Sequence, residues 1–270
     1  MRTEITAAEH EHYRTHGFVI LHDFLDAAEL EHWRGVFEDA MEKRGRIRMP
    51  WDTEGVKQDS TVFTQRVNLW QDHEPLRDLV VDARLGRIAT ELAEVSGIRL
   101  WHDHALVKEP YGSPTTWHMD NPYWSFTHRE ALSMWLALDD ATIQNGCMYF
   151  LPGVQHQGQP DKNGGAGGHD IGELMRLYPQ WRDIDPVAAE MKAGSCVFHS
   201  GYTPHSAGSN MTPRRRRAFV CTYMPVGSTY NGQPNIIPPD KLPGLKVGDT
   251  LEFDDLNPIL YQRSPTTASA

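Results

Sequence analysis

Residues 100–138 read LWHDHALVKEPYGSPTTWHMDNPYWSFTHREALSMWLAL, and the patterning of the chain changes where they begin. From residue 100 onward, short runs rich in β-branched and aromatic residues alternate with Pro, Gly, Asn and Asp. Such spacing is typical of the short strands of an all-β sandwich or barrel. The expected strands are Trp101–Val107, Thr115–Met119, Ala131–Leu138, Cys147–Leu151, Ser195–His199 and Ala218–Tyr223.

Before residue 100 the chain has helical patterning. Asp26 and Glu29 form a capping-box signature, so a first helix is expected to begin there. A second helix is expected over Pro75–Val95, because proline suits a first helical turn and Gly97 lies just past the pattern. The other expectations are apolar positions of the first helix at Leu30, Trp33, Phe37 and Met41, an irregular stretch over Arg46–Asp59 and a short helix over Ile171–Leu177.

Together these patterns predict a single domain, residues 1–270, of the mainly-β class with helices. A helical layer at about residues 7–97 is expected to pack against a β core at about residues 100–225, built as a sandwich or barrel. A C-terminal extension at about residues 226–270 completes the domain.

The composition argues against several classes of protein. The net charge is −10 and the pI is near 5.7, which does not suit a nucleic-acid binder, and the one dense basic run, Arg214–Arg217, is short. The three cysteines are far apart, as is typical of reduced thiols in a cytosolic protein. The polar N-terminus does not resemble a signal peptide, and apolar runs fall short of the roughly 20 residues that span a bilayer. The sequence therefore predicts a cytoplasmic protein without a membrane span.

His118, Met119 and Asp120 form the triplet that points most directly to chemistry. In a strand, alternation would place the imidazole of His118 and the carboxylate of Asp120 on one face, with Met119 turned away. A strand-borne His-x-Asp supplies two ligands of the 2-His-1-carboxylate triad of non-haem iron(II) enzymes, which leaves metal positions open. Because the chain has 14 histidines, a single one is more simply explained as a surface or hydrogen-bonded core residue.

The third ligand has to come from a distant segment, and His199 and His205 are the candidates. His205 lies in the run PHSAGSN at residues 204–210, and RRRRAF follows at residues 214–219. A histidine, an asparagine five positions later and an arginine before an apolar strand resemble the phytanoyl-CoA dioxygenase family of iron- and 2-oxoglutarate-dependent oxygenases. This resemblance favours His205 over His199.

The resemblance extends over about residues 10–260. It includes HGFVIL at residues 16–21, LVKEP at 106–110, WLALDDA at 135–141, NGCM at 145–148 and LPG at 151–153. It implies a double-stranded β-helix (jelly-roll, cupin-like) core packed against N-terminal helices. It also implies the use of iron(II), 2-oxoglutarate and O₂ to hydroxylate or otherwise oxidise a small molecule, with release of succinate and CO₂.

The resemblance assigns roles to individual residues. Arg216 would pair with the far carboxylate of 2-oxoglutarate, a role that suits the planar fork of a guanidinium. Arg215 and Arg217 adjoin it, so this register stays open by one. Because Asp120 is present where related halogenases have a small residue, the resemblance implies oxidation and not halogenation. The implied metal ligands are His118, Asp120 and His205, and the further 2-oxoglutarate positions are Trp135, His104 and Gln65 or its neighbour Arg66.

Aromatic residues flank the metal-binding stretch. Trp117, Tyr123 and Trp124, with Phe126, are candidates for the walls of a substrate pocket, although each has an equal claim to be a packing residue, as has Trp135. No other basic cluster suits the phosphates of CoA, which favours a free small molecule such as an amino-acid-like or natural-product intermediate. Two other functions stay open: a cupin-like metal enzyme without 2-oxoglutarate chemistry, and a non-catalytic sensor.

Overall fold

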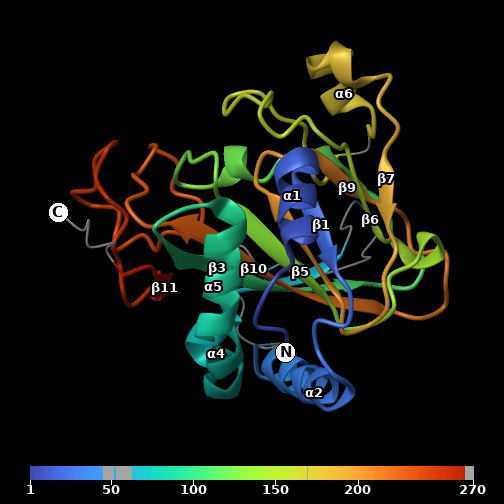
Figure 1. Cartoon of the computed structure of the whole chain (residues 1–270), viewed down its shortest axis with the longest axis horizontal. Coiled ribbons are helices and arrows are strands. Elements are labelled where there is room, and N and C mark those ends of the chain that lie inside the picture. The colour runs from blue at the N-terminus through green and yellow to red at the C-terminus, as the bar shows by residue number, and fades with distance from the viewer. Residues whose placement is uncertain (45–51, 53–62, 169, 265–270) are drawn as a thin grey trace.

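The computed structural model describes residues 1–44, 52, 63–168 and 170–264, which form two antiparallel β-sheets with helices against the larger one (Figure 1). The α-helices are α1 (Ala7–His16), α2 (Ala27–Arg44), α3 (Leu69–Asp72), α4 (Glu74–Val80), α5 (Ala83–Ala93) and α6 (Glu173–Leu177). The strands are β1 (Phe18–Leu21), β2 (Thr64–Val67), β3 (Gly97–Lys108), β4 (Thr115–His118), β5 (Leu132–Ala137), β6 (Met148–Phe150), β7 (Val187–Ala189), β8 (Cys196–Ser200), β9 (His205–Ala207), β10 (Arg216–Pro225) and β11 (Ile259–Gln262). Short 3₁₀ helices lie at Asn121–Tyr123, Ile143–Asn145 and Pro179–Trp181.

The larger sheet has seven strands in the order β1-β8-β5-β10-β3-β11, with β2 also paired to β3. The smaller sheet has four strands in the order β4-β9-β6-β7. Two facing antiparallel sheets confirm the expected jelly-roll class, but the sheets stay open, so the alternative of a closed barrel was wrong. The space between the two sheets contains the site described below.

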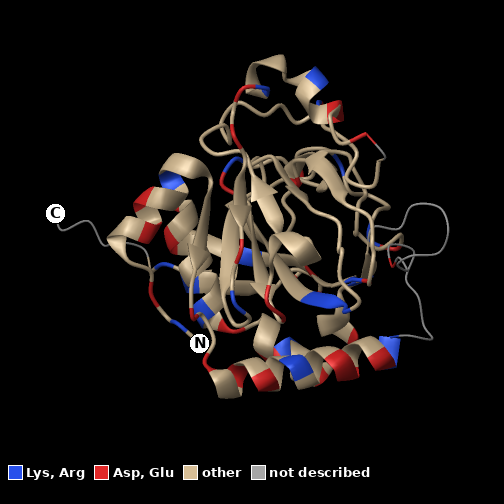
Figure 2. Ribbon diagram, turned by 90° about the vertical axis from the view of Figure 1, so that its right-hand side faces the viewer, with Lys and Arg blue, Asp and Glu red and all other residues tan. Residues whose placement is uncertain are grey.

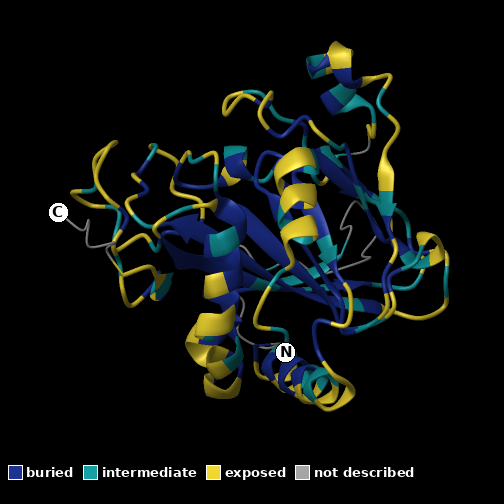
Figure 3. Cartoon of the chain, viewed as in Figure 1, coloured by how far each residue is buried: buried dark blue, intermediate teal, exposed yellow. Residues whose placement is uncertain are grey.

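The strands of the larger sheet are mostly buried (Figure 3), and alternation along them decides which residues the helices cover. In β10, Phe219 and Tyr223 belong to the core beneath the helices, whereas Ala218 and Val220 face the smaller sheet. The ring of Trp33, on α2, lies 5.5 Å from that of Phe219. Acidic and basic residues are distributed along α2 (Figure 2).

The capping box at the start of α2 is present as expected. The backbone N–H of Glu29 donates to Asp26 at 2.9 Å, and the Glu29 carboxylate accepts from the backbone N–H of Asp26 at 3.0 Å. The single helix expected over Pro75–Val95 was wrong, because the chain forms α4 and α5 instead. Asp82 separates them, and its carboxylate accepts the backbone N–H of Arg84 at 2.8 Å, which starts a new helix.

Gly97 was expected just past the end of the second helix. The residue that caps α5 is Glu94, and Gly97 is the first residue of β3. A Cβ atom at this position would lie 2.9 Å from the carbonyl oxygen of Tyr261, on β11. The glycine therefore permits the close approach of β11 to β3.

The expected division into a helical layer, a β core and an extension does not describe the larger sheet. Its strands β1 and β2 come from the N-terminal part, and β11 comes from the C-terminal extension. The three-residue strands β7 and β9 were also missed. The stretch expected to be irregular, Arg46–Asp59, lies outside the described residues apart from Asp52.

Candidate metal centre

Two histidines face each other across the smaller sheet. His118 ends β4 and His205 begins β9, and the two are direct partners in the antiparallel register. Their rings lie 4.2 Å apart between centroids, and both residues are buried. Cross-strand pairing therefore brings together two imidazoles that are far apart in the sequence.

Asp120 reaches the same point by a route that the sequence did not indicate. β4 ends at His118, and Asp120 has helical backbone angles at the start of a 3₁₀ turn, so strand alternation does not place its side chain. Its Oδ1 atom lies 3.6 Å from Nε2 of His118 and 3.6 Å from Nε2 of His205. Met119 is buried in an apolar cluster, as the expectation of a side chain turned away requires.

The turn that carries Asp120 is held by its neighbours. The backbone N–H of Asn121 donates to the carbonyl of Gly201 at 2.9 Å, and Trp124 packs where a Cβ on Gly201 would lie. The side chain of Asn163 contacts both backbone polar groups of Met119, at 2.8 Å and 2.7 Å. These contacts fix the backbone on both sides of Asp120.

Hydrogen bonds to the backbone decide which nitrogen of each paired histidine is free. Nδ1 of His118 lies 2.8 Å from the carbonyl oxygen of Thr116, and Nδ1 of His205 lies 3.0 Å from that of Thr203. A carbonyl only accepts, so Nδ1 carries the proton and the lone pair of Nε2 faces Asp120. Burial, with the neighbouring His118, lowers the pKa of His205 to about 3, which keeps that imidazole neutral.

The three ligand atoms of His118, Asp120 and His205 all lie within 4.8 Å of one another. Burial by itself would raise the pKa of Asp120, and positive charge beside the carboxylate lowers it well below its usual range. With both ligand imidazoles neutral, a bound metal ion would supply that charge. Two neutral imidazoles and one ionised carboxylate form the donor set of non-haem iron(II) enzymes, so these residues fit such a metal.

A cavity of about 100 Å³ adjoins these ligands. Most of its wall is apolar, and its polar residues come from β3, β4, β8, β9, β10 and the turn that carries Asp120. The described residues that line it are Phe63, His104, Leu106, Lys108, Thr115, His118, Asp120, Trp135, Met148, Ala166, His199, His205, Ser206, Ala207, Arg216 and Val220.

Two cationic residues line this cavity from adjacent strands. Arg216 on β10 and Lys108 on β3 are register partners, and they are 3% and 1% exposed. Arg216 donates to the carbonyl of Gly146 at 2.8 Å and lies over the ring of Trp135 at 5.0 Å. Among the described residues, no carboxylate lies within ion-pair distance of either cation, and Nε of Arg216 has no hydrogen-bond partner. A buried cation of this kind is costly unless an anion binds to it.

Burial lowers the pKa of both cations. The pKa of Arg216 falls to about 10, so its guanidinium stays charged at neutral pH. Burial, followed by repulsion from Arg216, lowers the pKa of Lys108 to about 7. A bound carboxylate would favour the charged form of both.

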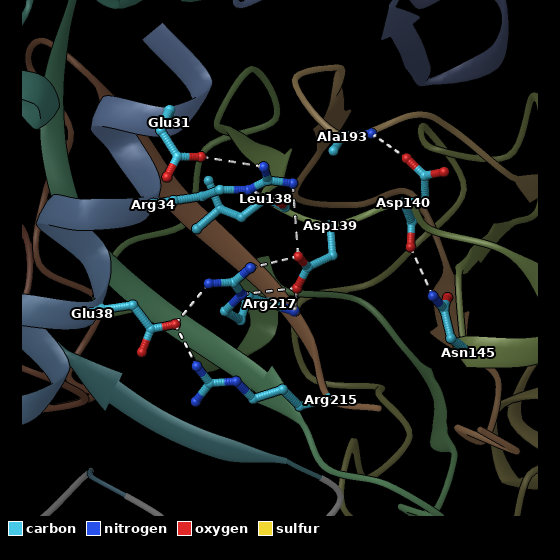
Figure 4. A network of polar contacts seen from close by, with 10 residues as sticks. All are labelled: Glu31, Arg34, Glu38, Leu138, Asp139, Asp140, Asn145, Ala193, Arg215 and Arg217. Carbon is cyan, nitrogen blue, oxygen red and sulfur yellow. Dashed lines mark hydrogen bonds and ion pairs between the residues drawn. The ribbon is translucent and has the colours of Figure 1, made fainter. Parts of the chain in front are cut away.

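The neighbours of Arg216, Arg215 and Arg217, are held by acidic side chains (Figure 4). Arg217 donates to the carboxylate of Asp139 at 2.6 Å and to that of Glu38 at 2.7 Å, and Arg215 donates to Glu38 at 2.6 Å. These contacts with α2 and with the end of β5 hold Arg215 and Arg217 on the outer face. Strand alternation then places Arg216 on the cavity side.

The other predicted site residues are distributed over four locations. His104 and Trp135 line the cavity, and Gln65 on β2 is the register partner of Leu106, which lines it as well. Tyr123 is 39% exposed, and its hydroxyl donates to the carbonyl of Gly164 at 2.6 Å. Trp117 packs on the apolar cluster around Met119, and Trp124 and Phe126 stack in another cluster. The described wall of the cavity contains none of these four aromatic residues, so their role with substrate stays a prediction.

The sequence did not reveal the roles of Lys108, His199 and Ser133. Alternation from His104 through Leu106 to Lys108 on β3 is a signal that identifies the lysine once the strand is extended to its full length. His199 and Ser133 contact Asp120 from the larger sheet, and no spacing in the sequence shows this.

Comparisons with known proteins agree with this geometry. The profile of the family described as phytanoyl-CoA dioxygenase (PhyH) matches residues 13–218. A methylphosphonate hydroxylase from Gimesia maris is 27% identical over 230 residues, which cover 83% of this chain and 82% of the relative.

Two solved structures of non-haem, α-ketoglutarate-dependent enzymes are also similar to this chain. The non-haem, α-ketoglutarate-dependent carbocyclase SnoK of nogalamycin biosynthesis has a TM-score of 0.78 and 29% identity, over 95% of this chain and 96% of its own. The epimerase SnoN, in complex with Fe³⁺, α-ketoglutarate and nogalamycin RO, has a TM-score of 0.73 and 28% identity, over 94% of this chain and 98% of its own.

The matched range includes the metal ligands, Arg216 and the described residues of the cavity wall except Val220, and the match covers most of the chain. The chain therefore belongs to the phytanoyl-CoA dioxygenase family of iron(II)- and 2-oxoglutarate-dependent oxygenases.

Proposed function

We propose that His118, Asp120 and His205 hold iron(II), and that Arg216 and Lys108 bind the far carboxylate of 2-oxoglutarate in the adjoining cavity. The observation that carries this proposal is the shared cavity. One part of its wall has a 2-His-1-carboxylate donor set, and another has two buried cations without a carboxylate partner among the described residues. A metal-binding jelly roll without 2-oxo-acid chemistry would have no use for the two cations.

The protein's own contribution is to orient the co-substrate and to keep water away from the reacting C–H bond. When bound, iron(II), 2-oxoglutarate and O₂ supply the oxidising chemistry, and 2-oxoglutarate is converted to succinate and CO₂. The fork of Arg216 meets a carboxylate with two parallel hydrogen bonds, and Trp135 keeps that fork in place from below. The apolar wall limits water around the reacting C–H bond. Of the further positions, His104 is proposed to contact the co-substrate, and Gln65 to border it.

The substrate is proposed to be a free small molecule that is hydroxylated or otherwise oxidised. CoA would need exposed basic groups for its phosphates, but Arg215 and Arg217 are paired with acidic side chains and Arg216 is buried. Only Arg214 of this run is left for such a ligand. The names of the relatives, a methylphosphonate hydroxylase and two enzymes of nogalamycin biosynthesis, fit free metabolites or natural-product intermediates.

The compartment is proposed to be the cytoplasm. All three cysteines, Cys147, Cys196 and Cys221, are buried free thiols, which suits a reducing environment. None of the described helices is long and apolar enough to cross a membrane.

An anaerobic titration tests the proposed function. Adding iron(II) and then 2-oxoglutarate should produce a weak visible charge-transfer band that changes when substrate is added. His118→Ala, Asp120→Ala and His205→Ala should each abolish the band while the circular dichroism spectrum is retained. A protein that binds iron without the band would be a jelly roll of another chemistry. Screening free metabolites for stimulated succinate release would then identify the substrate class.

A further inference from the structure

The second oxygen of the Asp120 carboxylate has partners of its own. Oδ1 lies between the two ligand histidines, but Oδ2 points toward the larger sheet. There, Nε2 of His199 lies 3.2 Å from Oδ2, and Oγ of Ser133 lies 3.4 Å from it. The two oxygens of one carboxylate therefore face two different sets of groups.

His199 differs from the ligand histidines in the nitrogen that carries its proton. A carboxylate that binds a metal is ionised, and an ionised carboxylate only accepts hydrogen bonds. Nε2 of His199 must then be the donor, and its Nδ1 is buried without a partner among the described residues. His118 and His205 are protonated on Nδ1 instead, because backbone carbonyls accept there. The same residue type thus supplies two metal-facing lone pairs and one donor.

Ser133 is part of a row across the larger sheet. His199, Ser133, Thr222 and His102 are consecutive register partners on β8, β5, β10 and β3. The Thr222 hydroxyl lies 3.2 Å from that of Ser133. A serine hydroxyl has one proton, so when Ser133 donates to Asp120 it accepts from Thr222. The carboxylate of Asp120, which only accepts, therefore sets the direction in which both hydroxyls donate.

We propose that His199 and Ser133 are positioning residues that bind Oδ2 of Asp120 and present Oδ1 alone to the metal. The inference rests on the proposed iron site, and it concerns how many positions the carboxylate occupies. A carboxylate held at one oxygen uses one position, whereas a free one can turn and use two. Holding Oδ2 from the larger sheet therefore keeps open a position that the co-substrates require.

Metal binding measured without turnover tests this role. Cobalt(II) is added to the intact chain, and its dissociation constant is measured by calorimetry and its coordination by the visible absorption spectrum. His199→Leu should weaken cobalt binding by about 10–100-fold and change the spectrum, because groups that orient a ligand have effects of that size. His199→Gln keeps an N–H donor and should recover part of the loss. Ser133→Ala should give a smaller change of the same kind, and Thr222→Val a smaller one still.

His73→Leu is the matched control. His73 is equally buried and also contacts a carboxylate, with Nε2 2.7 Å from Asp39, but it lies beside α4 and does not line the cavity. Its substitution should reduce stability while cobalt affinity and spectrum stay as in the wild type. Ser133→Ala removes one oxygen atom, so it keeps the test available if His199→Leu does not fold.

Two results would overturn the inference while leaving the iron site intact. In the first, His118→Ala abolishes cobalt binding but His199→Leu and Ser133→Ala bind with unchanged affinity and spectrum. In the second, His199→Leu and His199→Gln lose binding as completely as His118→Ala, which would make His199 a ligand. If His118→Ala itself bound cobalt normally, the proposed iron site would be wrong. This result differs from both outcomes above, in which His118→Ala does not bind cobalt.

Discussion

Arg216 is the residue on which co-substrate affinity should depend most. Arg216→Ala leaves the partner carboxylate desolvated, so the apparent 2-oxoglutarate affinity should fall by about 2–5 kcal/mol. Arg216→Lys should restore only part of this affinity, because the point charge of an ammonium does not reproduce the planar fork of the guanidinium. Arg214→Ala is the matched control and should be nearly silent, because that side chain is exposed. The measurement is the apparent 2-oxoglutarate constant at saturating iron(II) and substrate.

The register of the arginine run decides this prediction. An unchanged constant for Arg216→Ala, with a large rise for Arg215→Ala or Arg217→Ala, would show that the anchor is a neighbour. The ion pairs of Arg215 and Arg217 with Glu38 make that outcome unexpected.

Lys108 should make 2-oxoglutarate binding depend on pH near neutrality. Its pKa in the folded protein is lowered to about 7, so the ammonium is present below that pH and is lost above it. Affinity for the dianion should therefore decrease as pH rises from about 6 to about 9, by up to about tenfold per unit above the pKa. His205 does not titrate in this range, because its pKa is lowered to about 3. The measurement is the 2-oxoglutarate dissociation constant of the iron(II) protein, without O₂, at each pH.

Lys108→Met and Lys192→Met separate this effect from general charge. Lys108→Met should bind more weakly at low pH and lose the slope. Lys192 is 83% exposed and pairs with Asp140 at the surface, so Lys192→Met should keep the wild-type slope. A slope that persists in Lys108→Met would assign the titration to another group.

At the scale of elements, the contact between α5 and β11 should be sensitive to one methyl group. A Cβ on Gly86 would lie 2.6 Å from Cβ of Leu260 and 2.9 Å from its backbone carbon. Gly86→Ala should therefore push β11 from its place and reduce the free energy of unfolding by about 1–3 kcal/mol. Chemical denaturation followed by circular dichroism measures this change.

Gly35→Ala supplies the opposite case within another helix. Gly35 is exposed in the middle of α2, and a Cβ there would meet nothing within 4 Å. The free energy of unfolding should rise by about 0.5–1 kcal/mol, because alanine is the better helix former. A loss of stability in Gly35→Ala, or none in Gly86→Ala, would contradict the packing described for these helices.

At the scale of the whole molecule, a bound metal should connect the two sheets. His118 and His205 belong to the smaller sheet, and Asp120 is bound to the larger sheet through His199 and Ser133. Manganese(II) at about 100 times its dissociation constant should stabilise the fold by about 2.7 kcal/mol. For a chain of this size that corresponds to a rise in Tm of about 5–10 °C, measured by scanning calorimetry without O₂.

Asp120→Ala should remove most of this rise. Asp255→Ala should keep the rise in Tm, because that carboxylate forms an exposed pair with Lys241 and does not line the cavity. Equal rises in both variants would mean that manganese binds elsewhere.

The sequence by itself determined the chemistry and the class of fold. Strand-like runs separated by turn residues indicated a mainly-β domain, and the capping box at Asp26 located the start of α2. His118 and Asp120 were candidate ligands because a metal site needs particular residue types, and residue type is what a sequence records. His205 as the third ligand, and Arg216 as the anchor to within one position, followed from the resemblance to the family.

Tertiary structure decided what depends on neighbours distant in sequence. Strand alternation did not place Asp120, which lies in a turn held by Asn163 and Gly201. Whether His199 or His205 turns the lone pair of Nε2 toward Asp120 depends on which ring nitrogen meets a backbone carbonyl, and that acceptor is set by the fold. β1, β2 and β11 joined the larger sheet because a short strand is stabilised by its partners and not by its own pattern. Residue types specify which reaction a site can support, whereas long-range packing specifies which of several residues of the same type takes part in it.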